Sequence, residues 1–559
     1  MSRLPPLSGD GRAWSIALVA SLALGQAASA GMAAFATRDV FAAFRDASPA
    51  LPMTALGLVA LAGLAIALFR FCERVVAEEV GQNYASALRV RLFTHLTQIS
   101  AREVAMRRNG ALAMRFVGDL AAVRGWVSLG VARLISAGIV LPTATGILFL
   151  LDPNLGIAAG IPIALGLLAM VLAGPRLGPV HRRLRARRAR LAADMSERIP
   201  HAPELRLLGR TRTETNHLLN RTEKLIASAL ERARGAALLR AVPDAVSGIA
   251  AACVFLVALR TGVPAPETAG ALAAVGLMIQ PMRDLAGVWD RHRAWEAARE
   301  KCEKLLAIPK LERARATSQQ RKTDIPQSLR FTGVTAGVLA DITVKAAAGR
   351  KIAIVGGNGA GKSTLLNLAA GLEQPEAGKV RLGDRAPSSL GAAERRKLIT
   401  LVGARSPILA GSLRRALTMG VANRPDDAVI ISEAENFGLG PVLDRLGGLD
   451  GRLAEGGRNL SAGETRRVLL TRAALSDARL MLLDEPDDAL DAEGPLLVDR
   501  LIRRNDATTL IITHNLALAR KMDEIWFVEN GRLAEAGAPG DLIDGSGPAA
   551  RFFAPRCAA

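Results

Sequence analysis

Long apolar runs fill the first half of the chain. Six of them approach the ~20 apolar residues that a helix needs to cross a bilayer. They lie at residues 14–36, 51–71, 127–151, 155–173, 237–259 and 269–288. The fourth run is short, and Gln280, Arg283 and Asp284 interrupt the sixth. The pattern predicts an α-helical membrane domain with six spans.

The connections between these runs alternate in length. Residues 37–50, 152–154 and 260–268 are short, whereas residues 71–126 and 174–235 are long, polar and compatible with helix. We expect the two long loops to extend the spans as helices. Asn109-Gly110 breaks the apolar spacing of the first, and Pro200 and Pro203 break that of the second. Each break is a place for either a short transverse helix or an ordinary turn.

Arginine distribution predicts the orientation of the membrane domain. Six arginines lie within residues 181–191, and the short loops hold few basic residues. Basic loops stay on the cytoplasmic side, so the long loops and both termini are expected there. No aromatic residues interleave with these arginines, so we favour a solvated helix extension over a nucleic-acid site. The six arginines of this stretch are Arg182, Arg183, Arg185, Arg187, Arg188 and Arg190.

Composition and charge add little to the prediction of a membrane domain. The net charge of +20 fits a membrane protein with basic cytoplasmic loops. The four cysteines lie far apart and form no metal or redox pair. Ala28-Ser29-Ala30 resembles a signal-peptide cleavage site, but the apolar run continues to Ala36, which favours an uncleaved first span.

The second half of the chain reads as a soluble α/β domain. Residues 308–328 are polar, with a proline near each end, and are interpreted as a linker. The predicted organisation is therefore a membrane domain at residues 1–307, the linker, and a nucleotide-binding domain at residues 329–559. Strands are expected at residues 329–332, 341–345 and 351–355.

A glycine-rich loop follows the third of these strands and precedes an apolar helical run. Its sequence, GGNGAGKST, is the G-x-x-x-x-G-K-[ST] phosphate loop in its strand–loop–helix context. The glycines let backbone N–H groups face phosphate oxygens, Lys362 is expected to reach the β/γ-phosphates, and Ser363 to ligate Mg²⁺. We therefore predict that ATP and Mg²⁺ bind here. The binding residues expected are Gly356, Asn358, Gly359, Ala360, Gly361, Lys362, Ser363 and Thr364.

Two acids end a later apolar strand, LMLLDEP. Asp484 is expected to hold Mg²⁺ through its water shell, and Glu485 to act on the attacking water as general base. A strand-end turn without function is the alternative. His514 ends another strand, where a γ-phosphate sensor would be expected, although a lone histidine there is usually structural.

The segment LSAGE begins a further predicted helix. Ser461 and Glu464 form a capping box, and stabilising the helix start is one sufficient explanation for them. The functional alternative is an anion site for a γ-phosphate. If a separate subdomain carries this helix, the anion site serves a partner chain.

The order of phosphate loop, LSAGE, LLDEP, Ala489-Leu490-Asp491 and strand-end histidine resembles the nucleotide-binding domain of ATP-binding cassette (ABC) transporters. The membrane half resembles the exporter-type domain fused to it. The resemblance implies that two cassettes close head to tail, with Ser461 and Gly463 on the partner's ATP and Asp491 crossing the interface. It also implies coupling helices near residues 110–119 and 199–208, and a dimer.

Three positions depart from the family pattern. Residues 334–338 lack the aromatic that stacks on adenine, so base stacking is weaker or supplied from elsewhere. Ala404 occupies the position of a glutamine that senses γ-phosphate. Ala462 replaces the first glycine of the signature.

The expected function is an ATP-hydrolysing exporter half-transporter that moves an amphipathic or lipid-like solute out of the cytoplasm. We expect a homodimer ahead of a heterodimer with one partly altered site. A non-transporting regulatory membrane ATPase is the other alternative. The expected partners are a second half-transporter, the lipid bilayer and a solute that the sequence does not identify, with no nucleic acid. The expected location is a bacterial inner membrane, multi-pass, with the cassette in the cytoplasm.

Overall fold

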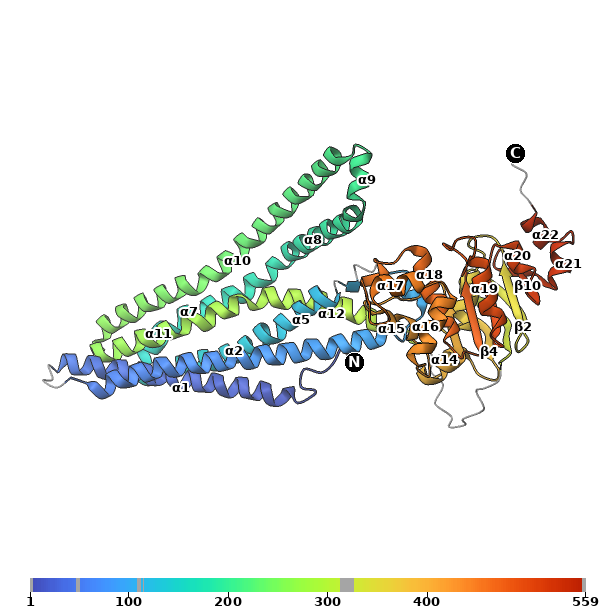
Figure 1. Cartoon of the computed structure of the whole chain (residues 1–559). Helices are drawn as coiled ribbons and strands as arrows, with labels where there is room; N and C mark the ends of the chain where they lie inside the picture. Colours follow the sequence, from blue (N-terminus) through green and yellow to red (C-terminus); the bar gives the residue numbers. More distant parts are fainter. Residues whose placement is uncertain (1–3, 47–50, 108–111, 114, 312–325, 555–559) are drawn as a thin grey trace. The chain divides into compact units, whose positions relative to one another are not determined.

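The computed structural model describes residues 4–46, 51–107, 112–113, 115–311 and 326–554. The chain divides into two compact units, shown in Figure 1. The first is Met1–Thr97 with Arg107–Pro309, and the second is Gln98–Met106 with Lys310–Ala559. The segment Gln98–Met106 was expected in the membrane domain but belongs to the second unit. Most of the predicted linker lies outside the described residues.

The first unit is helical, and all six predicted spans are helices. Within the described residues, five helical stretches of this unit are long and apolar enough to cross a membrane. The sixth predicted span forms a helix too, but its polar end keeps it below that level. The helices that carry the spans are α1 (Arg12–Arg45), α2 (Met53–Leu96), α6 (Ala132–Leu151), α7 (Pro153–Ala173), α10 (Thr211–Thr261) and α11 (Ala265–Ala286). Residues 37–45 were expected in a loop but continue α1, because no Pro or Gly interrupts them.

The long connections extend the spans as helices, as predicted. The first break, at Asn109-Gly110, lies outside the described residues. At the second break a short helix joins α8 to α10, as Figure 1 shows. The connecting elements are η1 (Arg115–Asp119), α5 (Leu120–Trp126), η2 (Val127–Val131), η3 (Gly174–Leu177), α8 (Gly178–Arg198), η4 (Ile199–His201), α9 (Ala202–Leu207) and α12 (Val288–Leu306).

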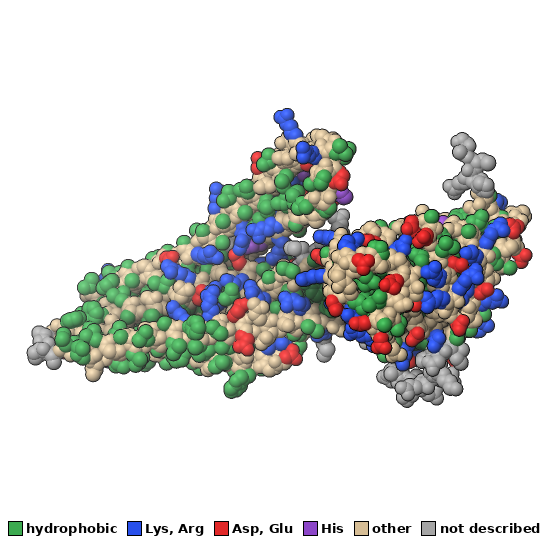
Figure 2. Space-filling view, viewed as in Figure 1, with side chains coloured by type: hydrophobic (Ala, Val, Ile, Leu, Met, Phe, Trp, Pro, Cys, Tyr) green, Lys and Arg blue, Asp and Glu red, His purple; other side chains and the backbone are tan. Residues whose placement is uncertain are grey.

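The two largest apolar clusters in the described part of the first unit join most of its helices. One joins α6, α7, α10 and α11 and includes Leu148, Leu155 and Met278. The other joins α2, α5 and α12 through Leu88 and Leu120. Figure 2 shows hydrophobic side chains on the outside of one end of this unit and Lys and Arg side chains gathered on its other half. Outward-facing apolar residues on the spans are what a lipid environment requires.

The second unit contains a central sheet of parallel strands with one antiparallel edge. Its order is β11-β10-β3-β9-β8-β5. A smaller antiparallel sheet has the order β2-β1-β4, and β6 pairs with β7. The strands are β1 (Leu329–Ala336), β2 (Leu339–Ala346), β3 (Lys351–Val355), β4 (Ala377–Leu382), β5 (Ile399–Val402), β6 (Gly411–Ser412), β7 (Arg452–Leu453), β8 (Leu480–Asp484), β9 (Thr508–Ile512), β10 (Glu524–Glu529) and β11 (Arg532–Gly537).

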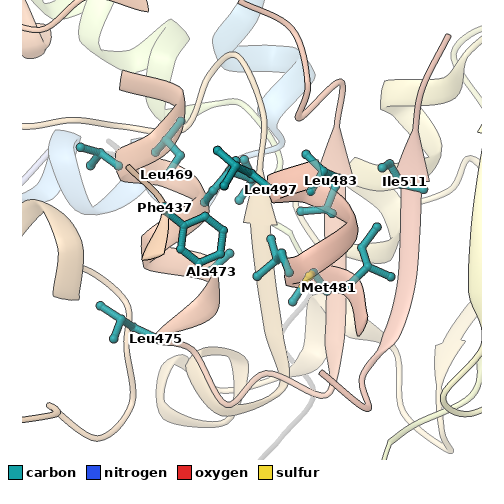
Figure 3. Close-up of a cluster of buried hydrophobic side chains, with 14 of the residues drawn as sticks. Phe437, Leu469, Ala473, Leu475, Met481, Leu483, Leu497 and Ile511 are labelled. Carbon is teal, nitrogen blue, oxygen red and sulfur yellow. The ribbon is translucent and has the colours of Figure 1, made fainter. Parts of the chain in front are cut away.

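Helices cover both sides of the central sheet. One core, with Phe331, Leu365 and Trp526, fills the space between the two sheets around α13. The other, with Phe437, Leu483 and others shown in Figure 3, packs α18 and α19 on the opposite face. The helices are α3 (Ala101–Ala105), α13 (Lys362–Ala369), α14 (Ala392–Leu398), α15 (Leu413–Thr418), α16 (Asp427–Asn436), α17 (Gly440–Leu446), α18 (Ala462–Ala474), α19 (Gly494–Arg503), α20 (Leu516–Ala519), α21 (Pro539–Ile543) and α22 (Pro548–Phe553), with short turns η5 (Pro387–Ser389) and η6 (Glu455–Gly457).

Candidate functional site: a phosphate loop at the carboxyl end of the central sheet

The phosphate loop connects the central strand β3 to α13. Gly356, Gly359 and Gly361 adopt φ of 152°, 80° and 102°, a region that L side chains rarely enter. A Cβ on Gly356 would also lie 2.0 Å from the Val528 carbonyl oxygen. These glycines are therefore required by the backbone path. Asn358 on the loop is exposed, Ala360 is buried, and Thr364 lies in the first turn of α13.

Lys362 begins α13 and lies back across the loop. Its Nζ donates to the carbonyl oxygens of Gly356 at 2.7 Å and Gly357 at 3.0 Å. The side chain is 7% exposed. Burial lowers its pKa, against the opposing effect of the Glu485 and Asp484 carboxylates. The loop therefore holds a buried ammonium group against its own backbone at the start of a helix, an arrangement suited to a polyphosphate.

Asp484 ends β8 beside this loop. Burial raises its pKa, while a hydrogen bond from Ser363 lowers it. A hydroxyl and a carboxylate in contact are hard oxygen donors of the kind that Mg²⁺ takes alongside phosphates and water. Among the described residues, no group of three or more His, Cys, Asp or Glu could hold a metal ion by itself. Ser363 and Asp484 therefore fit a Mg²⁺ ion whose remaining ligands would come from the phosphates and water.

Glu485 and His514 meet at the ends of the adjacent strands β8 and β9. His514 Nε2 lies 3.1 Å from Glu485 Oε1, and both side chains are about half exposed. Glu485 has a φ of 50°, and its N–H donates to Ile512 O at 3.0 Å. A left-handed non-glycine residue at a strand end is uncommon and directs this carboxylate off the sheet. Both predicted residues therefore lie together, at the edge of the sheet from which the phosphate loop starts.

The LSAGE segment forms the start of α18, with the capping box predicted. Ser461 Oγ accepts from Glu464 N at 3.1 Å, and Glu464 Oε2 accepts from Ser461 N at 2.8 Å. Arg445 donates to both carboxylate oxygens of Glu464, and this pairing lowers the pKa of Glu464. Ser461 is exposed, and a Cβ on Gly463 would lie 3.2 Å from Ala489 O.

Two family models match the chain, in the order in which its units occur. Residues 15–264 match the ABC transporter transmembrane region, and residues 339–488 match the ABC transporter model. The chain belongs to the ABC transporters. Its fusion of one membrane domain to one cassette makes it an exporter-type half-transporter, in which ATP hydrolysis is coupled to transport.

Known relatives agree with this assignment, and a solved structure has the same fold. The chain is 28% identical over 489 residues to the glutathione/L-cysteine transport system ATP-binding/permease protein CydC of Escherichia coli, covering 85% of this chain and 84% of the relative. It is 25% identical to the ATP-dependent lipid A-core flippase of Alcanivorax borkumensis, covering 88% and 87%. The structure of a bacterial Atm1-family ABC exporter with ATP bound superposes with a TM-score of 0.81 at 21% identity, covering 99% and 100%.

One position of the family pattern, Asp491, has a partner that the sequence did not indicate. Asp491 Oδ2 accepts from Arg467 Nη2 on α18 at 2.8 Å. Arg467 also donates to Phe437 O. An arginine in a helix gives no sign in sequence of which loop it will reach, so this tie could not be foreseen.

Ala404 follows the end of β5, directly after Gly403. A Cβ on Gly403 would lie 3.2 Å from Asp484 Cβ, and the turn is closed by Ser406 Oγ, which accepts from Gly403 N at 3.0 Å. Ala404 is exposed. The segment therefore lies beside Asp484, the candidate Mg²⁺ ligand, and Ala404 contributes only a methyl group there.

Proposed function

We propose that two copies of this chain form an ATP-driven exporter in which each ATP lies between the phosphate loop of one copy and the Ser461 helix start of the other. The observation that carries this proposal is that the residues expected to bind ATP form two separate groups within one cassette. Lys362, Asp484, Glu485 and His514 gather at the edge of the central sheet. The Ser461 helix start instead has Arg445, Asn459 and Ala489 as its neighbours.

Within this arrangement the sheet-edge residues divide the chemistry. Lys362 neutralises the β/γ-phosphates. Ser363 and Asp484 would hold Mg²⁺, which would supply stabilisation of negative charge on the phosphates. Glu485 accepts a proton from the attacking water. His514, 3.1 Å from Glu485, orients that carboxylate and contacts the γ-phosphate. Gly463, together with Ser461, contacts the partner's ATP, and Asp491 crosses the interface between the two cassettes.

The Glu485 role is tested by Glu485→Gln in the full chain. The amide keeps the size of the side chain but cannot act as a base, so hydrolysis should fall by about 10²–10⁴-fold. ATP binding should persist. Asp488→Asn, an exposed carboxylate of the same segment, is the matched control. Turnover in Glu485→Gln equal to that of the control would assign the base to another residue.

The exposed apolar residues around α9 support a dimer. Ile199, Leu207 and Leu208 are 67%, 86% and 70% exposed at the junction of α8 and α10. A polar loop would not place three large apolar side chains in water without a partner surface. We infer that this junction is the second coupling segment, and that it contacts the cassette of the other copy. A homodimer is the simpler assembly. Full ATPase activity of the chain purified without any second transporter would support it, and activity dependent on a different half-transporter would identify a heterodimer.

A cavity in the first unit bears on the solute. It measures about 210 Å³ and is lined by polar groups from α1, α2, α6 and α11. Gln26 donates to Glu73, Ser136 donates to Glu73 at 3.3 Å, and Arg133 pairs with Asp284 at 3.3 Å. Charged residues inside membrane spans mark functional sites. Pockets that hold a drug-sized molecule measure about 300 Å³ or more, so this smaller cavity has room for only part of such a molecule. We infer that it takes the charged head group of an amphipathic solute.

The solute proposal is tested by ATPase stimulation in proteoliposomes. A zwitterionic lysolipid should stimulate turnover, and an uncharged alkyl glucoside should not. Glu73→Gln should weaken the response, while Glu79→Gln, on the same helix and exposed, should leave it intact. Stimulation by the uncharged amphiphile alone would contradict the proposal.

The basic α8 and the chain's relatives favour a bacterial inner membrane, with export from the side that bears the cassette.

A further inference from the structure

The turn between β1 and β2 borders the phosphate loop. We call Gly337 and Val338 the base turn. A Cβ on Gly361 would lie 3.1 Å from Val338 Cγ2 and 2.4 Å from Leu339 Cδ2, so this turn lies against the last glycine before α13. The Val338 side chain is 58% exposed. A nucleotide whose phosphates occupy the loop therefore has the base turn as a neighbouring surface for its base.

The base turn offers little for a base to bind. Gly337 has no side chain, and Val338 provides a few methyl groups. An aliphatic side chain of this kind provides no planar surface. A base needs a flat group on which to stack.

Arg102 brings a planar group to this turn from a distant part of the sequence. Its helix α3 belongs to the second unit, where Ala101 N donates to Leu372 O at 2.9 Å. A Cβ on Gly337 would lie 3.3 Å from Arg102 Nη1. The absence of a side chain at Gly337 is thus what gives the guanidinium access to the turn.

Glu376 positions this guanidinium. Its Oε1 accepts from Arg102 Nη1 at 3.0 Å and from Gly337 N at 3.1 Å. These two bonds hold the pKa of Glu376 below its usual range, with the Gly337 bond the larger cause. Glu376 N in turn donates to Thr335 O at 2.7 Å. One carboxylate therefore ties the guanidinium to the backbone of the turn, while the Arg102 side chain stays 52% exposed.

We propose that Arg102 supplies the stacking surface for the nucleobase in place of an aromatic residue on the base turn. A guanidinium is planar, weakly hydrated and stacks on bases. Such stacking accepts any base, because every base has a π-face. The site should therefore bind ATP and GTP with similar affinity. This inference rests on the proposed function, because it requires the triphosphate to occupy the Lys362 loop.

The ordinary alternative is a surface ion pair. An exposed pair such as Arg102 and Glu376 contributes little to stability and would not distinguish ligands with a base from ligands without one. The test therefore compares ATP and GTP with inorganic tripolyphosphate, which carries the same phosphates and no base.

The experiment measures the binding of all three ligands to the full chain and its variants. Arg102→Ala should weaken ATP and GTP by about ten-fold, within the range for loss of a base stack, and leave tripolyphosphate unchanged. Arg102→Lys keeps the charge without the planar face, so it should lose most of the same affinity. Arg330→Ala, an exposed arginine on β1, should bind all three ligands normally. Size-exclusion profiles identify any variant that has failed to fold.

Two outcomes would overturn the proposal. If Arg102→Ala weakens tripolyphosphate as much as ATP, the arginine acts only by its charge. If Arg102→Ala binds ATP and GTP normally, the base lies elsewhere. A failure of the phosphate-loop assignment appears separately, because Lys362→Ala would then bind tripolyphosphate as well as the unmodified chain does.

Discussion

Two helices of the cassette begin in contrasting ways. Helix α13 begins after Gly361, without a side-chain cap and without an acidic residue in its first turn. Helix α18 begins after Ser461, with a complete capping box and Glu464 in its first turn. Arg445 then neutralises Glu464 with two hydrogen bonds.

This contrast indicates different tasks for the two helix starts. The free N–H groups and positive end of a helix bind anions, and α13 leaves both available beside Lys362. In α18 the Ser461 hydroxyl is already bonded to the backbone, and a carboxylate occupies the same end. We therefore expect α13 to bind phosphate in a single copy, and α18 to contribute only when a partner's nucleotide draws Ser461 away from its cap.

The largest effect should come from Lys362→Ala. Removing the ammonium from the α13 start should reduce ATP affinity by about a hundred-fold, since hydrogen bonds to charged groups contribute up to ~3 kcal/mol, and turnover should fall to background. Equilibrium binding of labelled ATP measures the change. Lys345→Ala, exposed on β2, is the control. Normal ATPase activity in Lys362→Ala would contradict the phosphate-loop assignment. It would also contradict the proposed difference between the starts of α13 and α18.

A smaller and different loss is expected for Ser461→Ala. Loss of the cap should lower the free energy of unfolding by about 1 kcal/mol. Loss of the hydroxyl from the partner's ATP should reduce turnover about ten-fold or more, while ATP binding to a single copy stays unchanged. Thermal unfolding, binding and ATPase assays separate these effects. If Ser461→Ala weakened single-copy binding as Lys362→Ala does, the two helix starts would share one task.

Sequence reasoning predicted the features of this contrast that depend on local pattern. The strand, glycine loop and helix of the phosphate site follow from neighbouring residues, and so does the Ser461–Glu464 box. The contacts of Arg445, Arg467 and Arg102 could not be predicted, because each joins segments whose proximity only the folded chain sets. Arg102 illustrates this most clearly: its helix was assigned to the membrane domain, but it packs in the cassette unit. The sixth predicted span forms helix α11, and the polar residues Gln280, Arg283 and Asp284 lie within that helix.

The smallest effect concerns coupling at Ala404. A methyl group can neither accept from Mg²⁺-bound water nor donate to a phosphate oxygen, so basal ATPase should respond weakly to transport substrate. Ala404→Gln should increase substrate stimulation in proteoliposomes about five-fold, the equivalent of ~1 kcal/mol for one regained hydrogen bond. Stimulation that stays the same or decreases would show that coupling runs through other contacts.

The most direct test of the account is a disulfide cross-link between the two helix starts in different copies. Gly357→Cys places a thiol on the phosphate loop, where a Cβ meets nothing within 4 Å, and Ser461→Cys places one at the α18 start. Both are made in a Glu485→Gln chain without its native cysteines. Copies carrying Gly357→Cys are mixed with copies carrying Ser461→Cys, and ATP is added. We predict cross-linked dimers that require ATP and both cysteines. A cross-link that forms equally without ATP, or its absence in chains that bind ATP, would contradict the head-to-tail site.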